Sequence, residues 1–230
     1  MPPSKQMIEL AELAGGFIHE VKNHISTLGL NLQLLAEDFA SPQSPRERKA
    51  LERIHRLQGE CQRLVEVSND FLRFANAEEL HLVATQLDDV VAEMIDFALP
   101  TAKSNNITIT WYPGGTLPEI PLDRDLFKQV LLNLLLNAEQ AMPEGGEIIL
   151  QASATEEGVC LDVIDTGCGI EPERLEKIWK PFHTSKPGGS GLGLPTTRRI
   201  IVAHQGTIEV QSEAGRGTKF SIRLPLGGQK

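Results

Sequence analysis

The sequence has few cysteines, no long apolar run and no excess of basic residues, and each shortage excludes a class of protein. Its three cysteines are too few and too widely spaced for a disulfide framework or a CxxC metal site, which predicts free thiols in a reducing compartment. The net charge of −9 argues against nucleic acid as a partner, because binding the phosphate backbone needs clustered Lys and Arg.

The sequence also lacks a run of about 18 apolar residues and a signal-like start. We therefore expect no membrane contact in this segment and a cytoplasmic location, either alone or as the soluble part of a longer or membrane-anchored protein. The composition, 40 % hydrophobic and 23 % charged over 230 residues, is that of an ordinary globular protein with room for two small domains.

The first third of the chain is patterned as two long helices. Between residues 7 and 39 the apolar positions alternate spacings of three and four, which predicts one long helix with a heptad seam. The segment 41–45 breaks it, and Ser44, Pro45 and Glu47 then supply an N-cap, a first-turn proline and a capping-box acid for a second helix. Two antiparallel helices that each carry a continuous apolar stripe cannot bury both stripes against each other alone. We therefore expect residues 1–77 to form a hairpin, and two chains to combine into a four-helix bundle.

The pattern changes near residue 80, and 76–84 is the expected linker. Beyond it, residues 82–228 mix short alternating apolar runs with helical stretches, joined by hairpin turns at 155–158 and 213–217, which predicts an α+β two-layer sandwich. We expect strands at 107–112, 147–154, 160–165, 207–212 and 219–224, and helices at 88–104, 123–142, 171–179 and 195–204.

The stretch GFIHEVKNHIS, residues 16–26, places a histidine before an acid within the first helix. Counting from the seam puts His19, Glu20 and Asn23 on outward positions, with His19 and Asn23 one turn apart. One interpretation is a solvated helix surface. The other is a nucleophilic imidazole, whose proton on one nitrogen is held by the neighbouring carboxylate. A zinc site of the HExxH kind is excluded because Asn23 stands where the second histidine is needed.

Polar residues in the second half fall in two motifs that could meet a nucleotide. Asn133 and Asn137 lie one turn apart among leucines, either as a buried amide pair or as a face that meets magnesium and phosphates. Asp165 ends an apolar strand, and Gly167 and Gly169 follow it. This is either a strand-ending turn or a carboxylate that accepts a hydrogen bond from an exocyclic amine, with glycines that let a flat ring approach.

The stretch KPFHTSKPGGSGLGLP, residues 180–195, is rich in glycine and leads into a helix opened by Pro195. Free backbone amides at a helix N-terminus can bind an anion, and a flexible surface loop is the alternative. The spacing fits neither a dinucleotide fingerprint nor a Walker loop.

Taken together, these motifs resemble the transmitter core of bacterial sensor histidine kinases of the nitrogen-regulator-like kind, over essentially the whole chain. In chain order they are similar to the H, N, G1, F, G2 and G3 boxes, as GFIHEVKN, LLNLLLNA, DTGCGI, KPFHTSK, GGSGLGL and GRGT. The resemblance implies a homodimeric phosphotransfer hairpin followed by an ATP-binding domain of the Bergerat (GHKL) fold. Family members often carry a proline after the H-box asparagine, where this chain has His24.

The resemblance also implies a role for each site residue. His19 would accept the phosphoryl group, Glu20 would act as its acid/base partner, and Asn23 would orient the water that dephosphorylates the partner, a response regulator receiver domain. Asn137 would bind Mg²⁺ with ATP, and the other nucleotide-binding residues would be Asn133, Asp165, Gly167, Gly169, Lys186, Gly189, Gly191, Leu192 and Gly193.

Two other functions are compatible with this set of motifs. An ATPase of the same fold would need a glutamate where Asn133 stands, since an amide cannot take a proton from water. A catalytically silent, nucleotide-binding dimeric scaffold is the second alternative.

Overall fold

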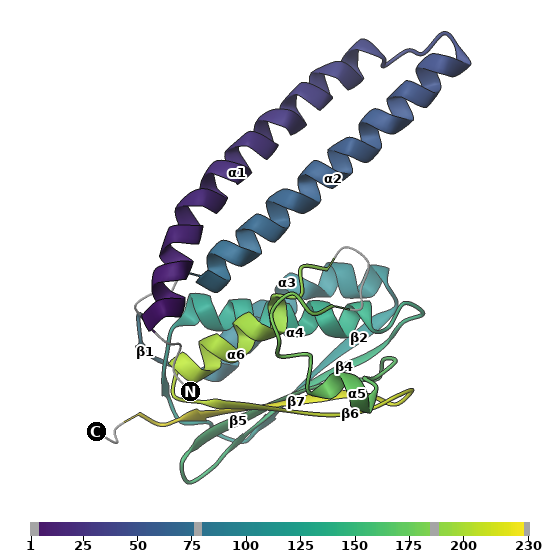
Figure 1. Ribbon diagram of the computed structural model, residues 1–230. Coiled ribbons are helices and arrows are strands. Elements are labelled where there is room, and N and C mark those ends of the chain that lie inside the picture. The colour runs from purple at the N-terminus through teal and green to yellow at the C-terminus, as the bar shows by residue number, and fades with distance from the viewer. Residues whose placement is uncertain (1–4, 76–79, 185–188, 228–230) are drawn as a thin grey trace. The chain divides into compact units, whose positions relative to one another are not determined.

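The computed structural model describes residues 5–75, 80–184 and 189–227, with the side chains of 5–17, 19 and 73–75 left out (Figure 1). The chain divides into two compact units. One contains residues 1–78 and 184–192, and the other contains residues 79–183 and 193–230. None of the helices in the described ranges has the length and apolar character needed to span a membrane.

The first unit is a helical hairpin. Its helices are α1 (Lys5–Asp38) and α2 (Pro45–Ala75), which confirms both predicted helices and the break between them. Helix α1 continues through His24, where no proline interrupts the backbone hydrogen bonds. At the start of α2 the Ser44 hydroxyl accepts a hydrogen bond from the backbone N–H of Glu47 at 3.2 Å, and the Glu47 carboxylate accepts one from the backbone N–H of Gln43. The predicted cap is therefore formed.

The second unit is a two-layer α+β sandwich, as predicted. Its five-stranded sheet has the order β2-β4-β5-β7-β6, in which β2 and β4 are parallel and the other neighbours are antiparallel. Helices α3, α4 and α6 cover one face of this sheet (Figure 1). The strands are β2 (Ile107–Gly114), β4 (Gly146–Ala154), β5 (Gly158–Asp165), β6 (Thr207–Glu213) and β7 (Gly217–Pro225), and the helices are α3 (Leu87–Ser104), α4 (Arg124–Gln140), α5 (Pro172–Leu175) and α6 (Gly193–Ala203).

Two segments differ from the sequence-based expectation. Strand β1 (Val83–Thr85) pairs antiparallel with β3 (Ile120–Leu122), so the expected linker 76–84 already contains the start of a strand. Three-residue strands are too short to show alternation, which is why periodicity missed them. The expected helix at 171–179 is regular only over the four residues of α5, and turns follow it.

Buried polar contacts fix the N-terminal end of α4. Asp123 is the N-cap, because its Oδ1 accepts from the backbone N–H of Leu126 at 3.1 Å, and its Oδ2 accepts from that of His81 at 2.9 Å. The backbone N–H of Asp123 donates to Nε2 of the buried His204 at 3.0 Å, while His204 Nδ1 donates to the carbonyl of Ile200 at 2.8 Å. These contacts join the segment before β1, helix α4 and helix α6.

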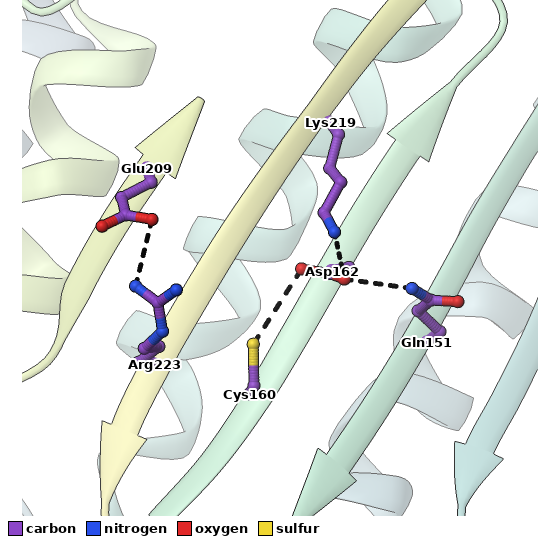
Figure 2. A network of polar contacts seen from close by, with 6 residues as sticks. All are labelled: Gln151, Cys160, Asp162, Glu209, Lys219 and Arg223. Atoms are coloured by element: carbon purple, nitrogen blue, oxygen red, sulfur yellow. Dashed lines mark hydrogen bonds and ion pairs between the residues drawn. The ribbon is translucent and has the colours of Figure 1, made fainter. Parts of the chain in front are cut away.

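The face of the sheet turned away from the helices carries a polar network (Figure 2). Lys219 Nζ lies 2.7 Å from Asp162 Oδ2, and Gln151 donates to the same oxygen at 3.0 Å. Burial alone raises the pKa of Asp162, but the hydrogen bonds from Lys219, Ser221 and Gln151 outweigh it and hold the pKa below its ordinary value. Burial, aided by the Asp162 charge, raises the pKa of the Cys160 thiol, so this cysteine stays protonated.

Asp162→Asn should lower the free energy of unfolding at pH 7 by about 1 to 2 kcal/mol, because it removes a charge-assisted contact that is mostly buried. Since the pKa of Asp162 is lowered by folding, its contribution is present above the unfolded pKa of about 3.9 and is lost as the pH falls through the folded value. Denaturant unfolding of both proteins from pH 7 to pH 3 should therefore show the difference shrinking below about pH 4.

The control is Glu213→Gln, which breaks the exposed ion pair with Arg216 and should change stability by less than about 0.5 kcal/mol. If the difference in the free energy of unfolding between the unmodified protein and Asp162→Asn stays constant from pH 7 to pH 3, the Asp162 carboxylate does not stabilise the fold in this way.

Candidate active site

Helix α4 carries the two asparagines singled out in the sequence. Asn133 and Asn137 are both half-buried and lie one turn apart, as expected from their spacing. The Asn133 amide donates to the carbonyl of Gly193 at 3.1 Å and to the hydroxyl of Thr197 at 3.3 Å. Asn133 therefore ties α4 to the first turn of α6. Thr197, which is fully buried, was not singled out in the sequence because nothing local marks it as a partner of residue 133.

The loop after β5 packs against the other end of α4. Asp165 is buried at the end of its strand, and its Oδ1 accepts from the backbone N–H of Gly167 at 2.9 Å. The backbone N–H of Cys168 donates to the carbonyl of Ala141 at 3.0 Å. The loop 165–169 and the start of α6 therefore both contact α4, and Asn137 lies on that helix between the two contacts.

Two glycines in this loop are required by close packing. A Cβ on Gly167 would lie 2.7 Å from the Cβ of Ala141, and a Cβ on Gly169 would lie 2.1 Å from the carbonyl oxygen of Glu213. Gly169 also has a φ of +68°, which disfavours any side chain. Both glycines thus serve the tight approach of backbone segments, and they leave the neighbourhood of the Asp165 carboxylate free of bulk.

The strand next to Asp165 contributes a residue that the sequence did not single out. Thr218 of β7 lies directly across from Asp165 in the antiparallel register and is buried. Its hydroxyl lies 3.0 Å from that of Ser212. The glycine pair before it in the GRGT turn was the available signal, since a Cβ on Gly217 would lie 2.0 Å from the carbonyl oxygen of Asp165.

The glycine-rich loop is described in part. Gly189 and Ser190 precede Gly191, which has a φ of +68°, and Leu192, which is fully buried. The Ser190 hydroxyl donates to Asp70 Oδ2 at 2.7 Å, so this stretch belongs with the helical unit. Lys186 lies outside the described residues.

The H-box residues lie on α1. Glu20 and Asn23 are exposed, as the seam predicts. His19 lies in the helix, but its side chain is outside the described part, so its outward orientation stays a prediction.

The chemistry of these groups fits a magnesium nucleotide. The buried carboxylate at the end of β5 can accept a hydrogen bond from an exocyclic amine. The amides of α4 and the glycines offer neutral oxygen ligands and N–H donors. Within the described residues, no three or more His, Cys, Asp or Glu side chains cluster as a metal site. A magnesium ion held by an amide oxygen together with phosphate and water oxygens needs no such cluster.

Comparison with known proteins agrees with this chemistry. The family described as "Histidine kinase-, DNA gyrase B-, and HSP90-like ATPase" matches residues 122–228. The sensor histidine kinase ZraS of Escherichia coli (strain K12) is 34 % identical over 226 residues, which is 98 % of this chain and 48 % of that protein. The chain thus spans about half the length of this relative.

Two solved structures share the fold. Full-length ShkA in complex with AMPPNP has a TM-score of 0.76 and 28 % identity, over 95 % of this chain and 46 % of that one. The catalytic domain of the histidine kinase ThkA has a TM-score of 0.59 and 30 % identity, over 64 % of this chain and 97 % of that one.

Asn133→Ala should loosen the start of α6, because the carbonyl of Gly193 and the hydroxyl of Thr197 lose a shared donor. We expect the free energy of unfolding to fall by about 1 to 2 kcal/mol and amide exchange in residues 193–197 to accelerate, as measured by hydrogen exchange. The control is Asn105→Ala, which removes an exposed amide that donates to Glu139 and should leave exchange in 193–197 unchanged. Equal amide exchange in residues 193–197 of both variants would contradict the proposed role of the Asn133 hydrogen bonds.

Proposed function

Because the chain belongs to the bacterial sensor histidine kinases, with their GHKL-type ATP-binding domain, we propose that it transfers the γ-phosphoryl group of ATP to His19. The group then passes to an aspartate of a response regulator receiver domain. The observation that carries this proposal is the arrangement around α4, where the loop of Asp165 and the start of α6 are both fastened to the helix that bears Asn133 and Asn137.

In this proposal the second unit holds the nucleotide. The Asp165 carboxylate accepts from the adenine amino group, and Gly167 and Gly169 let the base approach. Asn137, with Asn133 beside it, faces the phosphates, and Asn137 holds the magnesium ion, which supplies charge neutralisation when bound. The phosphates are further contacted by the glycine-rich loop, through Lys186, Gly189, Gly191, Leu192 and Gly193.

The chain's own contribution to the reaction is alignment and proton control. His19 attacks the γ-phosphorus with a neutral imidazole nitrogen, and ADP leaves with the electron pair of the broken bond. Glu20, adjacent in sequence and exposed on α1, holds the proton of the other nitrogen. Asn23, one turn after His19, orients water when the receiver is dephosphorylated.

The contacts of Asn133 favour a kinase over an ATPase of the same fold. A hydrolase needs a general base beside the attacking water, and an amide cannot take a proton. The amide nitrogen of Asn133 donates to Gly193 and Thr197, which gives the residue a positioning role instead.

The hairpin offers surfaces for both proposed partners. Leu28, Leu35, Leu57 and Leu64 are between 43 and 58 % exposed along the helical seam, which supports a homodimer that covers them. Leu30 and Leu34 are about as exposed as these four leucines. They lie on a different face of α1, the one that carries Asn23. A receiver domain that reaches His19 would cover this face, since the two leucines follow His19 by roughly 16 and 22 Å along the helix axis.

The function is tested by incubating the full chain with γ-labelled ATP and magnesium. We expect acid-labile, base-stable label on the protein, lost in His19→Gln and retained in His24→Gln, which changes an exposed histidine on another face of the helix. Asp165→Asn should weaken nucleotide binding at least 10-fold by calorimetry. Free phosphate without protein label would indicate an ATPase, and neither product would indicate the scaffold.

Leu34→Ala should slow phosphotransfer to a receiver domain about 10-fold by weakening docking, while autophosphorylation of His19 stays within twofold. The measurement is decay of pre-labelled protein on addition of receiver. Leu226→Ala, an exposed leucine in the other unit, is the control and should behave as the unmodified chain. If Leu34→Ala transfers as fast as the control, this face does not bind the receiver.

A further inference from the structure

The start of α2 carries a basic cluster that has no partner within the described part of the hairpin. Arg46, Lys49 and Arg53 are spaced by three and four residues, so they lie on one face of the helix. They line a recess of about 420 Å³ together with Pro45 and Ala50. The ion pair present among the described residues of the hairpin is Arg63–Glu60, and none of the three cations takes part in it.

This basic cluster lies on the same face of α2 as a row of exposed leucines, at the N-terminal end of that row. Leu57 follows Arg53 by four residues, and Leu64 follows Leu57 by seven, so the leucines and the cations share one face. The side of α2 that α1 covers is turned away from this edge and is marked by the buried Ile54. The cations therefore flank the surface that a second copy of the chain would cover.

Helix α1 shows the complementary charge on its own exposed edge. Leu28 and Leu35 are seven residues apart, and Asp38 follows Leu35 by three, so the acid extends the same edge by one turn. Asp38 is the last residue of α1, where the partial negative charge of the helix dipole disfavours an acid, and no basic residue lies in that last turn. Arg46, in the first turn of α2, is also poorly placed for the dipole of its own helix.

The register of the hairpin puts these opposite charges at one level. A Cβ placed on Gly29 would lie 3.9 Å from the Cβ of Cys61. Gly29 of α1 and Cys61 of α2 are therefore at the same level along the hairpin. Asp38 follows Gly29 by nine residues, so in this antiparallel pair it is level with the stretch between Lys49 and Arg53. In a four-helix bundle with its twofold axis along the helices, each helix has two antiparallel neighbours, and the partner's helices lie at the same levels.

We propose that Asp38 of one chain pairs with Lys49 and Arg53 of a second copy, so that opposite charges at the tip of each hairpin select and align the partner. Arg46 extends the same positive surface. The pairing occurs twice by symmetry, and each pair offsets the unfavourable dipole position of Asp38. The inference rests on the homodimer of the proposed function and adds the residues that specify it.

The test reverses the charges in the full chain. Asp38→Lys alone and Lys49→Glu/Arg53→Glu alone each place like charges opposite one another in a homodimer, so each should raise the dimer Kd at least 10-fold at low salt, by analytical ultracentrifugation. Mixed together, the two variants have opposite charges at both contacts, and differently tagged copies should form the heterodimer in preference to either homodimer. Higher salt should reduce the effects.

The matched control is Glu37→Lys, which makes the same change of charge at the adjacent residue on another face of α1 and should leave the Kd within twofold. A statistical mixture of dimers, or equal effects of Asp38→Lys and Glu37→Lys, would overturn the charge pairing. A monomeric unmodified chain would overturn the homodimer itself. Labelling of His19 and nucleotide binding, measured on the same samples, report separately on the kinase function.

Discussion

The anchoring of helix α4 is the constraint on which the nucleotide site depends. Asp123 caps the helix while its own N–H is held by the buried His204, so the start of α4 is fixed to α6 and to the segment before β1. Both ring nitrogens of His204 are thus engaged, one by the N–H of Asp123 and the other by the carbonyl of Ile200. Because that end is fixed, Asn133 and Asn137 take defined positions. The loops that contact α4 are positioned by the same helix.

The loops around α4 are shaped by close approach of backbone segments as well as by hydrogen bonds. Gly169 and Gly217 sit where a single added carbon would overlap a carbonyl oxygen of a neighbouring segment. Such contacts hold the loop of Asp165 against both α4 and the turn before β7, while the carboxylate itself stays buried at the strand end. In the proposed function this packing keeps the loop that meets the base rigid, which suits a reaction that asks the protein mainly for alignment.

The sequence predicted the elements with strong periodicity and missed the contacts that are not local. Both long helices and the sheet strands from β2 onward follow from repeated apolar spacing, and the cap at Ser44 follows from residue type alone. The pairing of β1 with β3 joins segments far apart in the chain, as does the bond between Asp123 and His204, and no local pattern encodes either. The motifs singled out Asp165 and Asn133, and the GRGT turn pointed toward Thr218, whereas Thr197 emerges only from the packing around it.

The hairpin depends on its surroundings more than the sandwich does. Among its described side chains Ile54 and Ser68 are the buried ones, whereas the sandwich has a continuous core between helices and sheet. Two long helices with exposed leucines on both sides of their seam gain most of their stability from what covers those leucines. Apolar burial alone does not distinguish one partner helix from another, because it is not directional. In the proposed dimer the charges at the hairpin tip supply the selectivity that the leucines lack, since a mismatched partner would place like charges together.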